Sequence, residues 1–155
     1  MKKLNSGFNL LELLIALAIT GILLMASAPG ILDFVVNTRI ASQTNDFVAA
    51  LAYTRSEALG RGRSVSLTSV GGDWANGFLV QQVSNGQVIR SYPALSGAAS
   101  LSATGGATAF TFGPTGLLGT GVDVLELCHG ADYTGRTISI TGVGVGNVEH
   151  KNDCS

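Results

Sequence analysis

The chain has 155 residues, which is the size of one domain. Hydrophobic residues make up 46% of the chain and charged residues only 12%, about half the usual share of charge. With a formal net charge of −1, these values exclude disorder over most of the chain and exclude a strongly basic nucleic-acid-binding protein. The segment 13–32 carries no charge and is long enough to span a bilayer, which excludes a simple cytosolic globule.

The N-terminus has the features of an export signal, because Lys2 and Lys3 precede the apolar segment. An ordinary secretory signal would be cut after the sequence Ala-Ser-Ala at 26–28. That cut would leave Pro29 at the cleavage site, where its fixed φ and missing N–H disfavour extended binding to a protease. The alternative is that the segment remains as a membrane helix. Glu12 favours this alternative, because an ionisable group inside such a helix is costly and is by default functional; the simpler interpretation is an interfacial carboxylate that snorkels.

Residues 7–15, Gly-Phe-Asn-Leu-Leu-Glu-Leu-Leu-Ile, resemble the type IV prepilin motif, with Asn9 where the family usually has threonine. The resemblance implies that a prepilin peptidase cuts between Gly7 and Phe8 and methylates the new amine of Phe8. Residues 1–7 would then be a leader peptide, and Glu12 would be the fifth residue of the mature chain. Pro29 falls where pilins often carry a proline that kinks the helix.

Glu12 and the new amino terminus form a predicted pair of opposite charges. Cleavage would create a cation at Phe8 that has no partner in its own chain, one helical turn away from Glu12. Pairing of Glu12 in one subunit with the Phe8 amine of a neighbour would neutralise both charges in a medium of low dielectric constant. We therefore predict that Glu12 is an assembly residue that sets the axial register of a filament.

After the apolar segment, the pattern predicts that the same helix continues with one apolar face. This stripe consists of Val36, Ile40, Phe47, Leu51 and Ala58, with Thr44 and Thr54 at the same spacing. The predicted helix runs from Phe8 to about Leu59 and ends at Gly60, a typical C′ residue. Pro29, together with Gly21 and Gly30, predicts a bend or local loosening. We assign 8–33 to the membrane or filament core and 34–155 to a periplasmic domain.

Short strands and glycine-rich turns are predicted from residue 64 onward. The candidates are 64–68, 77–83, 87–92, 108–112, 125–128 and 137–141, with a weaker one at 144–148. Asn85-Gly86 predicts a hairpin with a type I′ turn, and residues 95–106, which are small and glycine-rich, predict a loop. The predicted fold class is therefore α+β, a long N-terminal helix packed on a small antiparallel β domain.

Three further segments are similar to signatures of the GspH/FimT subgroup of pilin-like proteins. They are Arg-Ser-Glu-Ala at 55–58, Trp-Ala-Asn-Gly-Phe at 74–78 and Phe-Gly-Pro-Thr-Gly at 112–116. This subgroup contains minor type IV pilins of the FimT and FimU types and type II secretion pseudopilins of the GspH type. The resemblance implies a helical spine with a small β domain of two sheets.

Cys128 and Cys154 are the two cysteines, and in an exported domain an even number predicts a disulfide. The alternative is a zinc site with His129 and His150. We disfavour it, because adjacent residues of a strand such as Cys128 and His129 point to opposite faces. We interpret both histidines as surface residues, and we expect no metal, no cofactor and no enzyme activity, since no nucleophile elbow or paired carboxylate motif accompanies them.

Arg55, Arg61 and Arg63 cluster near the predicted end of the helix. The simpler interpretation is that cations are favourable near the negative end of a helix. The alternative is a DNA contact, because some FimT-type pilins bind DNA through a Gly-Arg-x-Arg pattern. In those relatives the pattern lies in the C-terminal region, where this chain offers only Arg136. Loss of Lys2 and Lys3 with the leader would leave seven basic against ten acidic residues, a net charge of −3 that weakens attraction to phosphates.

The predicted function is that of a minor type IV pilin, a structural subunit that primes or caps pilus assembly. The alternatives are a type II secretion pseudopilin of the GspH type and a DNA-binding minor pilin. The expected partners are other pilins, a prepilin peptidase, the inner-membrane assembly machinery and membrane lipid, with DNA kept as an alternative. The expected location is the bacterial inner membrane, crossed once, with the C-terminal domain in the periplasm, and then a pilus or pseudopilus.

Overall fold

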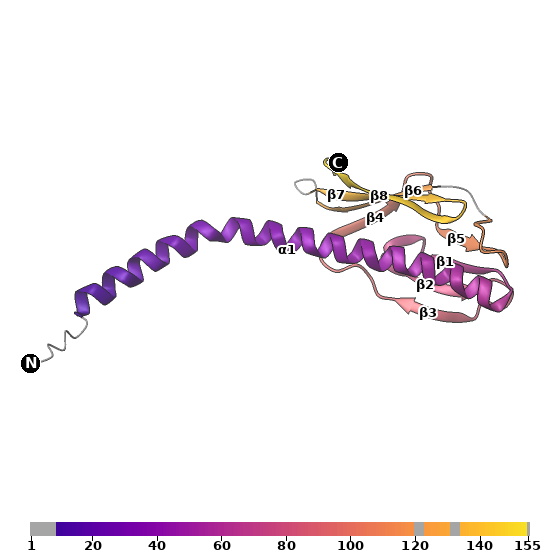
Figure 1. The fold of residues 1–155 in the computed structure, drawn as a ribbon, viewed down its shortest axis with the longest axis horizontal. Coiled ribbons are helices and arrows are strands. Elements are labelled where there is room, and N and C mark those ends of the chain that lie inside the picture. The colour runs from indigo at the N-terminus through magenta and orange to yellow at the C-terminus, as the bar shows by residue number, and fades with distance from the viewer. Residues whose placement is uncertain (1–8, 120–122, 131–133, 155) are drawn as a thin grey trace, which may run out of the picture. The chain divides into compact units, whose positions relative to one another are not determined.

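The computed structural model describes residues 9–119, 123–130 and 134–154, and within the helix it describes only the backbone of residues 25–30. It contains one helix and eight strands among these residues (Figure 1). The chain divides into two compact units, 1–35 and 36–155. The predicted cleavage site at Gly7 and Phe8 lies outside the described residues, and the side chain of Pro29 is not described either.

Helix α1 extends over Leu10–Arg61, two residues beyond the predicted end. The predicted stop at Gly60 is wrong, because Gly60 is still helical and Gly62 takes the left-handed conformation, with φ of 60°. The Gly62 N–H donates to the Leu59 carbonyl and the Arg63 N–H donates to the Ala58 carbonyl. This pair of bonds is a Schellman motif, which satisfies carbonyls at the end of the helix. The first strand begins three residues after Gly62, at Val65.

The second half of α1 has the predicted buried stripe. All five apolar stripe residues, Val36, Ile40, Phe47, Leu51 and Ala58, are buried, with exposures of 9% or less. Thr44 and Thr54 are buried on the same face, and their hydroxyls donate to the carbonyls of Ile40 and Ala50 at 2.8 and 2.7 Å. Because these hydroxyls find partners in the preceding turn, threonine fits the apolar stripe without an unsatisfied polar group.

Eight strands form two antiparallel sheets of four. The first has the order β3-β2-β1-β5 and consists of β1 (Val65–Val70), β2 (Asp73–Gln82), β3 (Val88–Tyr92) and β5 (Ala109–Phe112). The second has the order β4-β6-β7-β8 and consists of β4 (Ala99–Ala103), β6 (Asp123–His129), β7 (Gly135–Thr141) and β8 (Gly144–Lys151). These sheets confirm the predicted α+β class.

The predicted loop at 95–106 is wrong in part, because it contains strand β4. This strand pairs with β6 from Ala99 opposite His129 to Ala103 opposite Leu125, and Leu101 is 2% exposed. Alanine and serine on either side of a single leucine have little preference for a strand. The strand forms because β6 supplies hydrogen-bond partners and the core accepts Leu101.

The predicted hairpin between β2 and β3 is present, but its turn is not type I′. A type I′ turn needs positive φ at both central residues, and among the described residues only glycines have positive φ. Here Gly86 takes φ of 67° and donates its N–H to the Gln82 carbonyl, while Asn85 accepts a bond from the Gln87 N–H through its side chain. The chain therefore uses a longer loop with one left-handed glycine.

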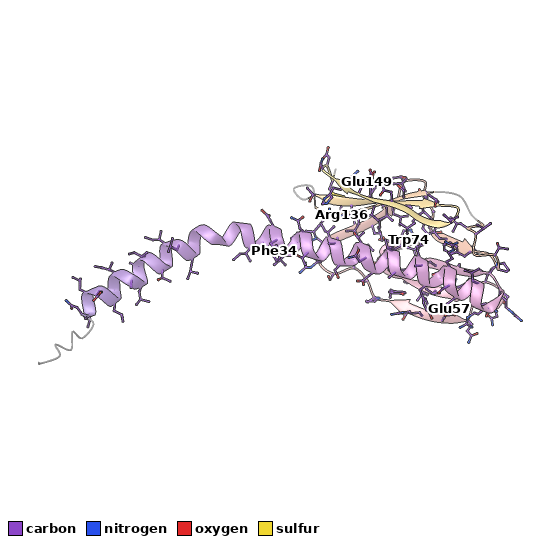
Figure 2. The ribbon with its side chains drawn as sticks, viewed as in Figure 1. Phe34, Glu57, Trp74, Arg136 and Glu149 are labelled. Atoms are coloured by element: carbon purple, nitrogen blue, oxygen red, sulfur yellow. A yellow bond between two sulfur atoms is a disulfide. The ribbon has the colours of Figure 1, made fainter. Side chains whose placement is uncertain are left out.

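One hydrophobic core joins the second half of α1 to both sheets. Phe47 of α1 lies edge-on to Trp74 and Phe78, with ring centroids 5.4 Å apart in both pairs. Trp74 stacks on Phe110 and donates its indole N–H to the Ala107 carbonyl at 2.7 Å (its position is labelled in Figure 2). Burial of each such side chain stabilises the fold by about 1.5–3 kcal/mol, so this cluster fixes the helix against the sheets.

Candidate assembly site

The first turn of α1 places Glu12 behind an asparagine cap. The Asn9 side-chain oxygen accepts a hydrogen bond from the Leu11 N–H at 3.4 Å, and the Asn9 carbonyl accepts one from the Leu13 N–H at 3.2 Å. Asparagine is as favourable as threonine or better at this position, so the departure from the usual motif residue preserves the cap. Glu12 is the third residue after the cap, where a carboxylate is favoured by the helix dipole.

Apolar side chains surround the helix from this first turn onward. Ten leucines and isoleucines have exposures from 52% to 75%: Leu10, Leu11, Leu13, Leu14, Ile15, Leu17, Ile19, Ile22, Leu23 and Leu24. A helix that is apolar on every side is normally buried in a membrane or in the core of a larger assembly. The segment 10–24 therefore presents a continuous exposed apolar surface that carries a single carboxylate, Glu12.

Among the residues that the structure describes, no helix is both long enough and apolar enough to cross a membrane.

The four arginines predicted as DNA contacts have different surroundings. Arg55 is half-buried, and its Nη1 donates to the Val143 carbonyl in the β7–β8 turn at 2.6 Å. Its Nε is buried without a hydrogen-bond partner beside a cavity of about 390 Å³ between α1 and that turn. Arg55 therefore links the helix to the second sheet through a hydrogen bond, and its side chain does not extend into solvent as a free cation.

Arg61 and Arg63 lie at the C-terminal end of α1. The Nε of Arg61 is 2.6 Å from the Glu57 carboxylate, which lowers the pKa of Glu57. A hydrogen bond between Glu57 and Tyr53 raises the pKa of Tyr53. Arg63 is exposed just after the helix ends. One of these two cations is thus paired with a neighbouring carboxylate, which reduces the net positive charge at this end.

Arg136 belongs to another part of the domain. It is the second residue of β7, lies opposite His150 of β8, and forms a very short contact with the Nδ1 of that ring. The turn that Arg55 contacts follows the other end of β7, about 17 Å away at 3.3 Å per residue. Figure 2 labels Arg136 and Glu57 on separate parts of the domain. The structure therefore does not bring the four arginines into one patch.

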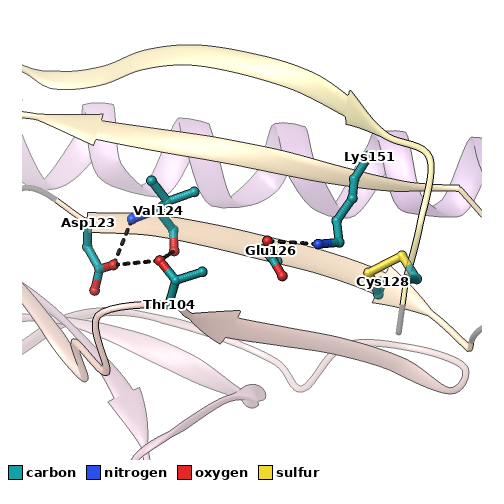
Figure 3. Close-up of polar contacts among 7 residues, drawn as sticks. Thr104, Asp123, Val124, Glu126, Cys128 and Lys151 are labelled. Carbon is teal, nitrogen blue, oxygen red and sulfur yellow. Dashed lines mark hydrogen bonds and ion pairs between the residues drawn. A yellow bond between two sulfur atoms is a disulfide. The ribbon is translucent and has the colours of Figure 1, made fainter.

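The two cysteines form the predicted disulfide, with an S–S distance of 2.06 Å and a Cα–Cα distance of 5.7 Å. The bond joins β6 to the chain after β8 (Figure 3) and excludes the zinc alternative, because zinc needs thiolates. Gly135 makes room for it: a Cβ at that position would lie 2.6 Å from the Cys154 sulfur and 2.9 Å from the Cys128 sulfur. Of the two histidines, His150 is exposed and His129 is half-buried.

Asp123, the first residue of β6, accepts hydrogen bonds from a neighbouring loop. The sequence pattern did not predict a role for this residue. Its carboxylate accepts hydrogen bonds from the N–H groups of Val124, Gly105 and Ala107 at 2.7, 2.8 and 3.2 Å. The Thr104 hydroxyl donates at 3.4 Å (Figure 3). Burial raises the pKa of Asp123, but these bonds together outweigh it and hold the pKa below its usual value.

Two family models match this chain. The model of the type II transport protein GspH matches residues 43–144, which is more than half of the chain. The chain belongs to the GspH family. A prokaryotic N-terminal methylation motif matches residues 2–28 and includes Gly7, Phe8 and Glu12. The GspH match begins in the second half of α1 and ends in β8, so it covers the core of the β domain.

Solved structures with a similar fold include the type IV minor pilin FimU of Pseudomonas aeruginosa. One FimU crystal structure, in space group P21, has a TM-score of 0.65 and 20% identity, and the match covers 79% of this chain and 99% of FimU. Another, in space group P65, has a TM-score of 0.60 and 21% identity, with coverage of 74% and 99%. Comparison with curated proteins finds no significant match.

The family models and the fold agree on the class of protein. The chain has the pilin fold, a long helix packed on antiparallel sheets, and carries the N-terminal methylation motif. It is a minor type IV pilin or a GspH-like pseudopilin. This confirms the predicted family, fold class and general function.

Proposed function

We propose that this GspH family member is a minor pilin that primes or caps a type IV pilus. The observation that carries the proposal is the segment 10–24 of α1, where apolar side chains are exposed on every side around one carboxylate, Glu12. Packing of such segments from several subunits would cover them, and Glu12 would pair with the amino terminus of a neighbour. The chain's part in this process is structural, so the proposal includes no catalytic step and no cofactor.

The same proposal gives the chain a path to the filament. A prepilin peptidase removes residues 1–7 and methylates the amine of Phe8. The segment 8–33 holds the mature chain in the inner membrane, with 34–155 in the periplasm, until the assembly machinery adds it to other pilins. The match of the methylation motif to residues 2–28 supports this order of events.

A pseudopilin of a type II secretion system is the second candidate. The description of the matching family, a type II transport protein, favours it. The two candidates share the fold, the processing and the use of Glu12, and they differ in the machine that adds the subunit. Recovery of the chain with sheared pili supports the pilin, whereas loss of protein secretion in a strain without the chain, with pili intact, supports the pseudopilin.

Processing is the first testable prediction. Cleavage after Gly7 depends on a recognised motif, and the competing site after residue 28 is blocked by Pro29. We expect mass spectrometry of the protein from bacterial membranes to find a mature chain that begins with methylated Phe8. In a Gly7→Ala variant we expect the full-length chain to accumulate. A mature chain that begins at Pro29 would contradict the pilin proposal.

A further inference from the structure

The sequence contains two Asn-Gly dipeptides, Asn76-Gly77 and Asn85-Gly86, and neither takes part in the proposed function. Asparagine followed by glycine is prone to deamidation, because glycine has no Cβ to shield its backbone nitrogen from the asparagine side chain. The reaction joins that nitrogen to the side-chain carbonyl carbon in a ring, so the peptide between the two residues must turn. The dipeptides are identical, and any difference in their reactivity must come from the fold.

The first dipeptide is held in place by the first sheet. Asn76 and Gly77 belong to β2, an inner strand that pairs with β1 on one side and with β3 on the other. The Asn76 side chain is exposed, but Gly77 is buried. A Cβ at Gly77 would lie 2.5 Å from the carbonyl oxygen of Tyr92 and 2.9 Å from the carbonyl carbon of Pro93. Because Gly77 is packed this closely against backbone, the peptide before it cannot turn while the sheet is intact.

The second dipeptide lies in the loop between β2 and β3. Asn85 and Gly86 are both exposed, and a Cβ at Gly86 would meet nothing within 4 Å. The Gly86 N–H donates to the Gln82 carbonyl at 2.9 Å, and this bond must open before the nitrogen can react. Water replaces the lost partner in an exposed loop, where local opening requires little free energy. The peptide between Asn85 and Gly86 can therefore turn without disturbing the core.

The loop also orients the side chain that reacts. Oδ1 of Asn85 accepts a hydrogen bond from the Gln87 N–H at 3.1 Å. An N–H group donates only to the amide oxygen, so Nδ2, the group that leaves, takes no part in this bond. Negative charge develops on Oδ1 when the Gly86 nitrogen attacks Cγ of Asn85. A donor that is already in place stabilises this charge, as donors do in an oxyanion hole.

We propose that Asn85 is a site of spontaneous deamidation and that the fold protects Asn76 from the same reaction. The Gly86 nitrogen loses its proton to solvent and bonds to Cγ of Asn85, the bond from Cγ to Nδ2 breaks, and ammonia leaves. Water then opens the resulting succinimide at either of its carbonyls, which gives aspartate or isoaspartate. The net reaction consumes one water and releases one ammonium ion, with no oxidant, reductant or cofactor. Its product adds a negative charge to the loop before β3, an edge strand of its sheet. The assignment does not depend on the proposed function.

The test compares the two asparagines within one peptide. Trypsin releases residues 64–90 intact, and this peptide contains both sites. The full chain in detergent micelles is incubated at mildly alkaline pH and digested, and fragmentation in a mass spectrometer locates the residue that has been converted. A sample digested without incubation gives the background. We expect deamidation at Asn85 to be faster than at Asn76 by at least about tenfold, a difference of about 1.4 kcal/mol in the barrier.

Incubation in concentrated urea is the control for local sequence. Both dipeptides are then unfolded, so we expect the two rates to become nearly equal. Equal rates in the folded chain, a faster reaction at Asn76, or a difference that persists in urea would overturn the proposal.

Two matched variants test the site and the chemical step. Asn85→Gln should abolish the fast reaction, because the longer side chain would have to close a larger ring, whereas Asn76→Gln, at another exposed asparagine, should leave it unchanged. The rate at Asn85 should also rise with pH, since the attacking nitrogen must lose its proton. A fast reaction that survives Asn85→Gln, or a rate that does not depend on pH, would contradict attack by the Gly86 nitrogen.

Discussion

At the scale of single residues, the carboxylate of Asp123 accepts backbone hydrogen bonds that a neighbouring strand would otherwise accept. The loop between β4 and β5 runs from Thr104 to Thr108, and two of its N–H groups point to Asp123 rather than to another strand. A Cβ at Gly105 would lie 2.9 Å from the carboxylate, so only glycine allows this close approach. The side chain therefore ties together β6 and a loop that would otherwise leave buried donors unsatisfied.

Replacement of Asp123 should lower stability and change its pH dependence. In Asp123→Asn, the amide nitrogen faces backbone donors, so we expect a loss of about 1–3 kcal/mol in the free energy of unfolding at pH 7. The folded pKa of Asp123 lies below its unfolded value of ~3.9. Its contribution is therefore present above pH ~4 and is lost as the pH falls below that value. Urea unfolding of the full chain in micelles at pH 7 and at pH 3 measures both effects.

The matched control is Asp153→Asn, since Asp153 is an exposed carboxylate of the same charge. We expect this variant to unfold like the wild type at both pH values. The prediction is wrong if Asp123→Asn loses as much stability between pH 7 and pH 3 as the wild type does. That result would mean that the hydrogen bonds to Asp123 do not favour its charged form.

At the scale of elements, the end of α1 depends on backbone conformation rather than on packing. Gly60 and Gly62 are both exposed, and a Cβ at either position would meet nothing within 4 Å. They differ in their dihedral angles, because Gly60 is helical and Gly62 has φ of 60°. The segment 60–63, Gly-Arg-Gly-Arg, contains two glycines that could end the helix. The helix ends at the second of them, Gly62.

Alanine at these two positions should have opposite effects. Gly60→Ala should stabilise the fold by about 0.5–1 kcal/mol, because alanine loses less backbone entropy in a helix. Gly62→Ala should destabilise it by about 1–2 kcal/mol, because a Cβ is unfavourable in the left-handed region. Thermal unfolding followed by near-ultraviolet circular dichroism of Trp74 measures both changes. Effects of the same sign would contradict the assignment of Gly62 as the C′ residue.

At the scale of the whole molecule, the N-terminal segment of α1 makes sense only in an assembly. Its leucines and isoleucines are exposed, whereas most of those in 36–155 are buried in a core. Two roles are open to Glu12. Within its own helix it occupies the third position after the Asn9 cap, and between subunits it could pair with the amino terminus of a neighbour. These roles can be separated, because glutamine serves almost as well as glutamate in a capping box but carries no charge.

Glu12→Gln should leave membrane insertion and cleavage intact, since the apolar segment and Gly7 are unchanged. It should reduce recovery of the chain in the sheared filament fraction by at least about tenfold, because loss of one partner of a buried ion pair costs about 3–5 kcal/mol and glutamine recovers part of it. Glu149→Gln, at an exposed position of β8, is the control. Wild-type incorporation of Glu12→Gln would show that the carboxylate acts only within its own helix. Partial incorporation would favour a place at the end of the filament, where one neighbour is absent.

Local patterns in the sequence were sufficient for several features of this protein. The spacing of Ile40, Phe47, Leu51 and Thr54 predicted the buried face of α1, because a helix repeats every 3.6 residues wherever it lies. The pair of cysteines in an exported chain predicted the disulfide. The motif at residues 7–15 indicated the pilin family, which the family models confirm.

Other features depended on groups that are distant in sequence and meet only in the folded chain. Strand β4 exists because β6 pairs with it, although its own alanines and serines favour no strand. Asp123 is anionic and buried because backbone N–H groups from the loop at 104–107 converge on it. Gln43 forms part of a cavity because the loop after β3 returns to α1 at Ser96. The physical reason is the same in each case: hydrogen bonds and burial across the fold, rather than local preference, decide the state of these residues.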